Sequence, residues 1–374
     1  MEATTGSRRT DTCDVVVVGA GIVGAAVAVR IARFGMQVAV LDAQKVAGGA
    51  TGRSAGMVVA GLPGHYRRAV KAFGREQART LWALTIEGRE RLAESANRVG
   101  VTLERVGSLA VAVTEEEVET LRASAELLRE DGFDAWFGTT DPLGRGFLAT
   151  LRQPDDGVVD VAELTRALLS SAPIAVHTDT EVYELEPTGE GVRVWAQGRN
   201  VRCGRVVLTV DGYASLLDPA LSQWVTQGRA LIVTTEPLAG AGFPIPCYAN
   251  YGHKYACPLP DGRWALGAWW RPRPGAAPIE PDQSLREGLG RFITRYFPEV
   301  RGRIAGRRSG VMGFTSDGIP VVGRLPPPSP VVFALGFGGW GLSWAFVAAE
   351  RLVEWILQDT DPGILSVERL TGNR

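Results

Sequence analysis

The feature that most constrains the fold of this chain is a glycine-rich turn near the N-terminus. Residues 14–18 (DVVVV) have the β-branched, apolar composition of a strand that is buried on both faces of a parallel sheet. The turn GAGIVG follows at residues 19–24, and a helix is expected over residues 22–34. A second strand is expected over residues 37–41, directly before an acidic residue. This order of elements predicts a dinucleotide-binding unit of the Rossmann type.

The three glycines of the turn have separate physical roles. The first permits a tight turn, the second leaves room for a pyrophosphate, and the third lets the helix pack closely on the strand. The N–H groups at the start of the helix can bind the diphosphate, and Asp42 can accept hydrogen bonds from ribose hydroxyls. An acid at this place fits FAD or NAD, and the motif alone does not separate them. The nucleotide is therefore assigned to Gly19, Gly21, Ile22, Val23, Gly24, Asp42 and Ala43.

Composition excludes several classes of protein. With 40 basic and 41 acidic residues the formal net charge is −1, which does not favour binding to nucleic acid. No run of about 18 apolar residues is present, so no membrane span is expected. Four cysteines lack the spacing of a metal site, and we expect them to be reduced in a cytoplasmic protein without a metal. The length of 374 residues suits two domains, and the polar residues 1–13 are expected to be a disordered tail.

The loop after Asp42 distinguishes between the two cofactors. Residues 47–56 (AGGATGRSAG) resemble the small-residue loop that flavin-dependent amine and amino-acid oxidoreductases place against the flavin. The chain as a whole resembles the D-amino-acid oxidase-like superfamily, which includes glycine oxidase, sarcosine oxidase, D-amino-acid dehydrogenase and γ-glutamylputrescine oxidase. Further motifs follow in the family's order, namely PDDGVVD at 154–160, TEV at 180–182, VVLTVDGYA at 206–214, GVMGFTSDGIPVVG at 310–323 and GFGGWG at 336–341.

The resemblance implies an α/β fold with two domains. A discontinuous, Rossmann-like FAD-binding domain would comprise residues 14–73, 151–217 and 306–374, and an antiparallel-sheet substrate-binding domain would comprise residues 74–150 and 218–305. Non-covalent FAD is implied, because Gly310 stands where sarcosine-oxidase-like members attach their flavin to a cysteine. The further cofactor-binding residues that the resemblance implies are Ala50, Thr51, Arg53, Ser54, Ala55, Val182, Gly212, Gly336, Gly338, Gly339, Trp340, Gly341 and Leu342.

Departures from the family pattern bear on the substrate. Met312 stands where amino-acid members have an arginine that binds the substrate carboxylate, and a thioether cannot replace that arginine. Ser343 stands in place of a second carboxylate-binding lysine, and Ala265 approximately in place of a lysine that activates oxygen. The absence of both carboxylate-binding groups favours an amine and a γ-glutamylputrescine-oxidase-like branch. Arg53 can still hold a carboxylate, so the amino-acid alternative stays open.

An aromatic wall is expected beside the flavin. Residues 248–257 are expected to form one strand, joined through a turn at 260–262 to a strand over 263–270. Alternation would put Tyr251, His253 and Tyr255 on one face, and Lys254 with Asn250 on the other. Trp340 replaces the histidine common in the family's second glycine-rich loop and would restrict the pocket. The candidates for contact with substrate are therefore Tyr251, Tyr255, His253, Trp340, Met312 and Arg53.

The predicted activity is oxidation of the C–N bond of a small-molecule amine. A hydride would pass to the flavin, the imine would hydrolyse, and O2 or another acceptor would take the electrons. One alternative is an amino-acid or N-methyl-amino-acid oxidase or dehydrogenase that uses another acceptor. A further alternative, from a different class, is a flavin-binding subunit without turnover of its own.

Overall fold

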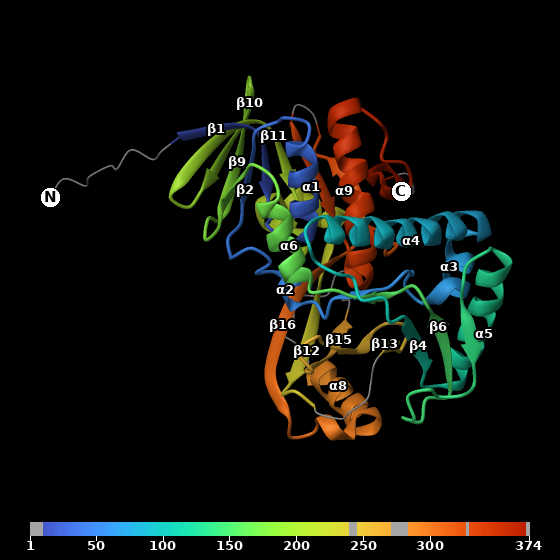
Figure 1. Ribbon diagram of the computed structural model, residues 1–374. Coiled ribbons are helices and arrows are strands. Elements are labelled where there is room, and N and C mark those ends of the chain that lie inside the picture. The colour runs from blue at the N-terminus through green and yellow to red at the C-terminus, as the bar shows by residue number, and fades with distance from the viewer. Residues whose placement is uncertain (1–9, 239–244, 271–282, 327–328, 372–374) are drawn as a thin grey trace.

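The computed structural model describes residues 10–238, 245–270, 283–326 and 329–371, which form two large sheets with helices around them (Figure 1). The first sheet contains the strands predicted to bind a nucleotide. Neighbours in its main path are parallel, apart from an antiparallel pair at one edge. The order along this path is β17 (Val321–Arg324), β18 (Val331–Leu335), β11 (Arg199–Leu208), β1 (Thr10–Val18), β2 (Val38–Leu41) and β8 (Ile174–His177). The antiparallel hairpin of β9 (Val182–Thr188) and β10 (Gly191–Ala196) joins β11.

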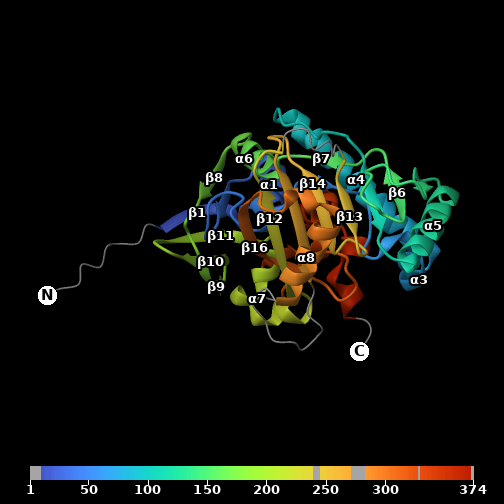
Figure 2. The same cartoon turned by 90° about the horizontal axis from the view of Figure 1, so that it is seen from below.

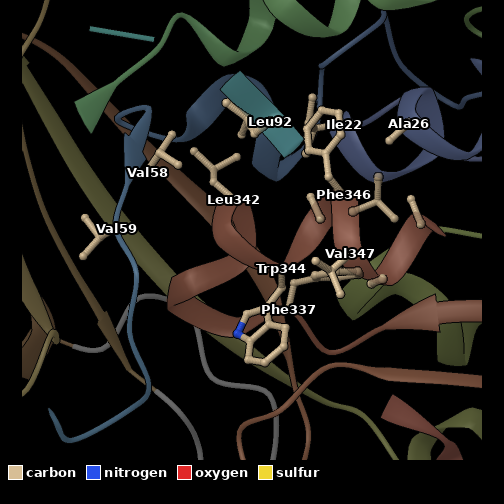
Figure 3. Close-up of a cluster of buried hydrophobic side chains, with 14 of the residues drawn as sticks. Ile22, Ala26, Val58, Val59, Leu92, Phe337, Leu342, Trp344, Phe346 and Val347 are labelled. Carbon is tan, nitrogen blue, oxygen red and sulfur yellow. The ribbon is translucent and has the colours of Figure 1, made fainter. Parts of the chain in front are cut away.

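Helices α1 (Ile22–Ala32), α6 (Val161–Ser170) and α9 (Gly341–Gln358) lie beside this sheet, and α4 (Arg75–Arg98) crosses α9 (Figure 1). Their meeting point is a buried apolar cluster that includes Ile22, Leu92, Leu342 and Phe346 (Figure 3). The crossing requires a glycine on α4, because a Cβ at Gly88 would lie 1.8 Å from the carbonyl oxygen of Ser343. This close approach fixes the start of α9 relative to α4.

The second sheet is antiparallel except where β13 pairs with β4. Its order is β16 (Ile304–Phe314), β12 (Thr226–Thr235), β15 (Trp264–Trp270), β14 (Lys254–Pro258), β13 (Cys247–Ala249), β4 (Ser108–Ala112), β6 (Ala149–Gln153) and β5 (Trp136–Gly138). Helix α8 (Gln283–Tyr296) packs across one face of this sheet (Figure 2). Helices α3 (His65–Phe73) and α5 (Glu115–Glu130) lie at the other end, beside β4 and β6 (Figure 1). The short elements are α2 (Ala50–Arg53), α7 (Ala214–Leu217), β3 (Met57–Val58) and β7 (Gly157–Val158).

The predicted α/β fold with one parallel and one antiparallel sheet is confirmed. The predicted residue ranges of the two domains stay a prediction. The sheet pairing differs from these ranges at one boundary, near residue 306. Strand β16 pairs with β12 in the second sheet, although residues from 306 onward were assigned to the cofactor domain. Helix α1 and strand β2 differ from their predicted ranges by one or two residues at one end, whereas strand β1 begins four residues earlier than predicted.

Two local predictions are wrong. Residues 10–13 are not part of a tail, because they pair in parallel with residues 200–203 of β11 and extend β1; residues 1–9 lie outside the described residues. Residues 248–257 are not one strand, because Asn250, Tyr251 and Gly252 have positive φ angles of 53°, 58° and 90° and form a turn between β13 and β14. The expected alternation of faces along this segment therefore does not occur.

Candidate active site

A single cavity of about 580 Å³ runs between the two sheets. It is lined on one side by the ends of β1 and β2, the start of α1, helix α2, the residues that follow β11, and the start of α9. On the other side it is lined by β12, β14, β15 and β16. The open edge of the parallel sheet and the inner face of the second sheet thus form one elongated site.

At one end of the cavity, the glycine-rich turn and Asp42 form a nucleotide-type site. The Ala20 N–H donates to Asp42 Oδ2 at 2.6 Å and the Gln44 N–H donates to Oδ1 at 2.7 Å. Burial raises the pKa of the Asp42 carboxyl, and these two backbone bonds oppose that shift. The carboxylate is therefore held at the end of β2 with lone pairs still free for ribose hydroxyls.

The three glycines divide their roles as the motif predicts. A Cβ at Gly24 would lie 1.9 Å from the carbonyl oxygen of Gly19, so this glycine permits helix–strand packing and does not line the cavity. Gly21 does line it, and a Cβ there would contact only Thr51 Oγ1, at 3.1 Å. Gly21 also provides no side-chain cap to α1, whose first N–H, that of Ile22, donates to Thr51 Oγ1 at 3.1 Å at the cavity wall. Such a helix start fits a diphosphate.

A nucleotide with its ribose and diphosphate at Asp42 and the start of α1 would direct its far end toward the other end of the cavity. That end is lined by the loop before α9, by α2, and by β15 and β16. Met312 of β16 forms a small apolar cluster there with Trp269, Phe314, Tyr255 and Trp340. The wall beside the ring is thus aromatic and largely uncharged.

Trp340 joins the two sides of the cavity. A Cβ at Gly61 would lie 2.8 Å from its Nε1, and a Cβ at Gly252 would lie 2.3 Å from its Cη2. The indole is therefore inserted between two glycines, one from the segment after β3 and one from the turn after β13. Its ring lies edge-to-face against Trp269 and Tyr248, with centroids 6.3 and 6.4 Å away.

Tyr255 and Trp269 complete the wall. Trp269 Nε1 donates to the Gly252 carbonyl at 2.7 Å, which fixes the indole against the turn. The Tyr255 ring lies over Gly267 of β15, where a Cβ would be 2.2 Å from it. The Tyr255 hydroxyl has no hydrogen-bond partner in the part of the chain that the structure describes, and burial raises its pKa. It is a neutral hydrogen-bonding group at the cavity.

Most of the predicted site residues come together in this cavity. Those that line it are Gly19, Gly21, Ile22, Val23, Asp42, Ala43, Ala50, Thr51, Arg53, Ser54, Ala55, Val182, Tyr255, Met312, Gly338, Gly339, Trp340, Gly341 and Leu342. Those that do not line it are Gly24, Gly212, Gly336, Tyr251 and His253.

Gly212 and Gly336 have packing roles instead. A Cβ at Gly212 would lie 2.8 Å from Val311 Cγ1, so the turn after β11 packs on β16 at this point. Gly336 has a φ of 80°, and a Cβ there would lie 2.5 Å from Thr315 Cγ2. Both positions therefore require glycine because neighbouring segments approach them closely.

Tyr251 and His253 are directed elsewhere because of the unpredicted turn. The buried carboxylate of Glu117 accepts from the Tyr251 N–H at 2.9 Å, and the Tyr251 hydroxyl donates to Glu116 at 3.0 Å. Arg68 lies over the Tyr251 ring, 3.6 Å from its centroid. His253 stacks on Trp269 with centroids 4.1 Å apart. Neither side chain is placed to contact a ligand.

Several cavity residues were absent from the predicted site, and three of them shape the ring end. Tyr248 and Trp269 line the wall, and their aromatic character in the expected hairpin was the available signal. Asp211 also lines it, and its carboxylate accepts from the N–H groups of Gly313 at 2.6 Å, Gly336 at 2.9 Å and Phe337 at 3.1 Å. Asp211 thereby fastens the second glycine-rich loop to the end of β16. The sequence signal for Asp211 was an acidic residue within the motif at residues 206–214.

The segment after β3 is held in place by buried side chains. The Ser343 hydroxyl donates to the Val59 carbonyl, and the Ala60 N–H donates to Asp156 at 3.0 Å. Burial raises the pKa of Asp156 to about 6, and Arg89 forms an ion pair with it at 2.8 Å. At neutral pH the carboxylate is therefore ionised and anchors the strip of backbone that Trp340 contacts.

Comparison with known proteins assigns this site to a family. The model of the family described as FAD dependent oxidoreductase matches residues 14–355. The chain belongs to this family of FAD-dependent oxidoreductases. FAD is therefore its cofactor, in agreement with the open start of α1, the fixed Asp42 and the elongated cavity.

Individual relatives are distant in sequence. Gamma-glutamylputrescine oxidoreductase of Escherichia coli (strain K12) is 25% identical over 379 residues, which cover 94% of this chain and 85% of the relative. Glycine oxidase of Bacillus licheniformis is 24% identical over 354 residues, covering 92% and 93% of the two chains. The structure of glycine oxidase from Geobacillus kaustophilus superposes with a TM-score of 0.74 at 21% identity, covering 94% of this chain and 96% of that one. This flavoenzyme thus shares the fold of that oxidase. In the part that the structure describes, no helix is long and apolar enough to cross a membrane.

Proposed function

We propose that this flavoenzyme oxidises the C–N bond of an amine to an imine, which water then hydrolyses to a carbonyl compound and a smaller amine or ammonia. The observation that supports this most is the composition of the ring end of the cavity. Its wall consists of Tyr248, Tyr255, Trp269, Met312 and Trp340, and Met312 supplies a thioether where a carboxylate-binding arginine would be needed. When bound, FAD supplies the hydride acceptor for the C–H bond next to nitrogen.

The protein's own groups would orient the amine and exclude water. Aromatic faces favour an alkylated nitrogen centre by stacking and by cation–π attraction. The Tyr255 hydroxyl can hydrogen-bond to the uncharged amine that must be present before hydride leaves. Trp340 closes the wall between the segment after β3 and the turn after β13.

A second candidate is oxidation of an amino acid or an N-methyl-amino acid. Arg53 favours it, because this arginine lines the cavity and can bind a carboxylate in a bidentate manner. A flavin-binding subunit without turnover is the third possibility. The complete wall at the ring end speaks against it, since an inactive subunit needs no substrate wall.

Non-covalent attachment of FAD and the use of O2 as electron acceptor are also part of the proposal. All four cysteines are free, and none of them lines the cavity, so no thiol is placed to bond to the ring. Ala265 is buried in a small apolar cluster with Ala55 and Ile232, so no cation stands at the place of the oxygen-activating lysine. The missing lysine favours the alternative in which another acceptor takes the electrons. The free cysteines also support a cytoplasmic location.

Anaerobic stopped-flow spectroscopy tests the proposed activity. Purified holoenzyme is mixed with a panel of primary and secondary amines and of amino acids, and the loss of oxidised-flavin absorbance is followed. Faster bleaching by amines supports amine oxidation, and faster bleaching by amino acids supports the second candidate. Recovery of colour in air indicates an oxidase, whereas recovery only with an added dye indicates a dehydrogenase. No bleaching with any member would leave the subunit alternative.

A further inference from the structure

The turn after β13 has a strained backbone at the ring end of the cavity. Asn250, Tyr251 and Gly252 have positive φ angles of 53°, 58° and 90°, and two of these three residues are not glycine. A tyrosine rarely adopts a positive φ, because its Cβ then lies too close to the backbone carbonyl oxygen that follows. Contacts from elsewhere in the fold must therefore hold this turn in its conformation.

The pairing of β13 with β4 brings the first turn of α5 to this strained segment. The two strands are parallel, with Tyr248 opposite Ala110. Three residues further along each strand, Tyr251 and Val113 both donate a backbone N–H to the side chain of Glu117. Helix α5 begins two residues after Val113, so its N-terminal carboxylates lie beside the turn.

Glu117 joins the start of α5 to the turn. It is the third residue of the helix, it is only 1% exposed, and its backbone N–H donates to the N-cap residue Thr114. A glutamate at this position of a capping box normally bonds back to the start of its own helix. Here Oε2 accepts from the Val113 N–H at 3.0 Å, while Oε1 accepts from the Tyr251 N–H at 2.9 Å. Burial raises the pKa of the Glu117 carboxyl, and these backbone donors oppose that shift.

The turn in question supports both indoles of the cavity wall. The Gly252 carbonyl accepts from Trp269 Nε1 at 2.7 Å. A Cβ at Gly252 would lie 2.3 Å from Trp340 Cη2, so the second indole rests directly on the backbone of the turn. Both tryptophans line the cavity, whereas Glu117 does not. A displaced turn would therefore release the wall although the altered side chain lies outside the cavity.

We propose that Glu117 is a positioning residue for the substrate wall. Its carboxylate holds residues 250–252 in the strained conformation on which Trp340 and Trp269 rest, and it thereby limits the size of the amine that the cavity accepts. The effect on substrate size rests on the proposed amine oxidation, whereas the effect on the turn does not depend on any activity. The neighbouring Glu116 provides a contrast, because it accepts from the Tyr251 hydroxyl and not from its backbone.

Anaerobic reduction of holoenzyme by N-benzylbutylamine and by N-methylbutylamine tests the limit on substrate size. E117Q keeps the length of the side chain but presents an amide nitrogen to one of the two backbone donors, so the turn should relax. The ratio of the second-order rate constant for the benzyl amine to that for the methyl amine should rise by about three- to tenfold. The matched control E116Q removes the neighbouring carboxylate and should leave this ratio unchanged.

Glycine at position 251 separates a positioning role from a general loss of stability. Glycine adopts a φ of 58° without steric strain, so the turn no longer needs the carboxylate. In the double variant E117Q/Y251G, the ratio should therefore return to within about twofold of the ratio for Y251G alone. A general destabilisation of α5 by E117Q would not be corrected by this second substitution.

Amide hydrogen exchange of residues 247–258 in the holoenzyme measures the turn without turnover. Exchange in this segment should be about tenfold faster in E117Q than in wild type and E116Q. If no amine reduces the flavin but exchange responds in this way, the proposed activity fails and the role of Glu117 in holding the turn stands. Equal exchange in wild type and E117Q, or an equal change in E116Q, would overturn the inference. An unchanged size ratio in an E117Q protein that amines reduce, or no rescue by Y251G, would overturn it as well.

Discussion

The two ends of the cavity are built in different ways. The nucleotide end is formed by residues close together in sequence, which act mainly through backbone N–H groups and through the absence of side chains at glycines. The ring end is formed by side chains from segments far apart, such as Arg53, Tyr255, Met312 and Trp340. An added side chain should therefore abolish function at the first end, whereas a changed side chain at the second should alter preference.

The largest effect is expected from Gly21→Val. A branched side chain at this position would extend from the start of α1 into the space for the diphosphate. We expect the affinity for FAD to fall by about a hundredfold or more, measured by titration of apoprotein with FAD. Gly189→Val, at an exposed glycine with open space around it, is the control. Full cofactor content in the Gly21→Val protein would show that the diphosphate lies elsewhere.

A smaller but selective effect is expected from Met312→Arg at the ring end. The new guanidinium would repel an ammonium group and attract an α-carboxylate in a poorly solvated place. The ratio of kcat/KM for α-amino acids to that for simple amines should rise by about 10- to 100-fold. Steady-state kinetics with a dye acceptor measures it. A folded, FAD-loaded variant with unchanged preference would mean that Met312 does not contact the substrate.

Trp340→Ala sharpens the comparison by removing volume from the same wall. Loss of the indole would open space between Gly61 and Gly252 and admit larger amines. We expect kcat/KM for a benzyl-substituted amine, relative to its methyl analogue, to rise by about tenfold. The control is Trp136→Ala, which removes a tryptophan that is 65% exposed on the edge strand β5. An unchanged ratio would show that the indole does not limit substrate size.

The smallest effect is expected from His65, which lies behind the ring end and makes the stability of the protein depend on pH. His65 is buried against Tyr248, and burial together with Arg68 lowers its pKa to about 3. The unfolded chain then binds one more proton between pH 6.5 and 3, so stability is lost as pH falls through this range. His65 should lower the free energy of unfolding by about 1 kcal/mol when the pH falls from 7 to 5.5.

His65→Asn isolates this contribution. His65 has a φ of 69°, which asparagine tolerates better than most residues. Denaturant unfolding of apoprotein at pH 7 and pH 5.5 should show a smaller loss of stability on acidification in the variant. An identical loss in the two proteins would mean that His65 remains accessible to protons.

The nucleotide end could be predicted from sequence because its geometry is local. Three glycines, a buried strand and an acid at a fixed distance determine one another within residues 14–42. The turn at Asn250 and Tyr251 could not be predicted, because two non-glycine residues adopt positive φ there. That conformation is supported by Glu117, 134 positions away in the sequence. The role of Asp211 depends in the same way on contacts with residues more than 100 positions distant.

The place of strand β16 shows the same limit. The glycine and threonine motif of residues 310–323 was assigned to the cofactor domain because family motifs were read in order along the chain. Its first residues, 310–314, are instead the end of β16 (Ile304–Phe314), which pairs with β12 in the second sheet. A motif identifies which residues meet the cofactor, but it does not identify the sheet that presents them.

The insertion of Trp340 between Gly61 and Gly252 also limits how this enzyme can diverge. A methyl group at either glycine would overlap the indole, so mutations at these positions are acceptable only after position 340 has become smaller. The three sites therefore change in a fixed order. In a library that randomises them together, tryptophan at 340 should survive selection for bound FAD only with glycine at both other positions. Specificity at this wall would evolve by coupled replacements instead of by independent ones.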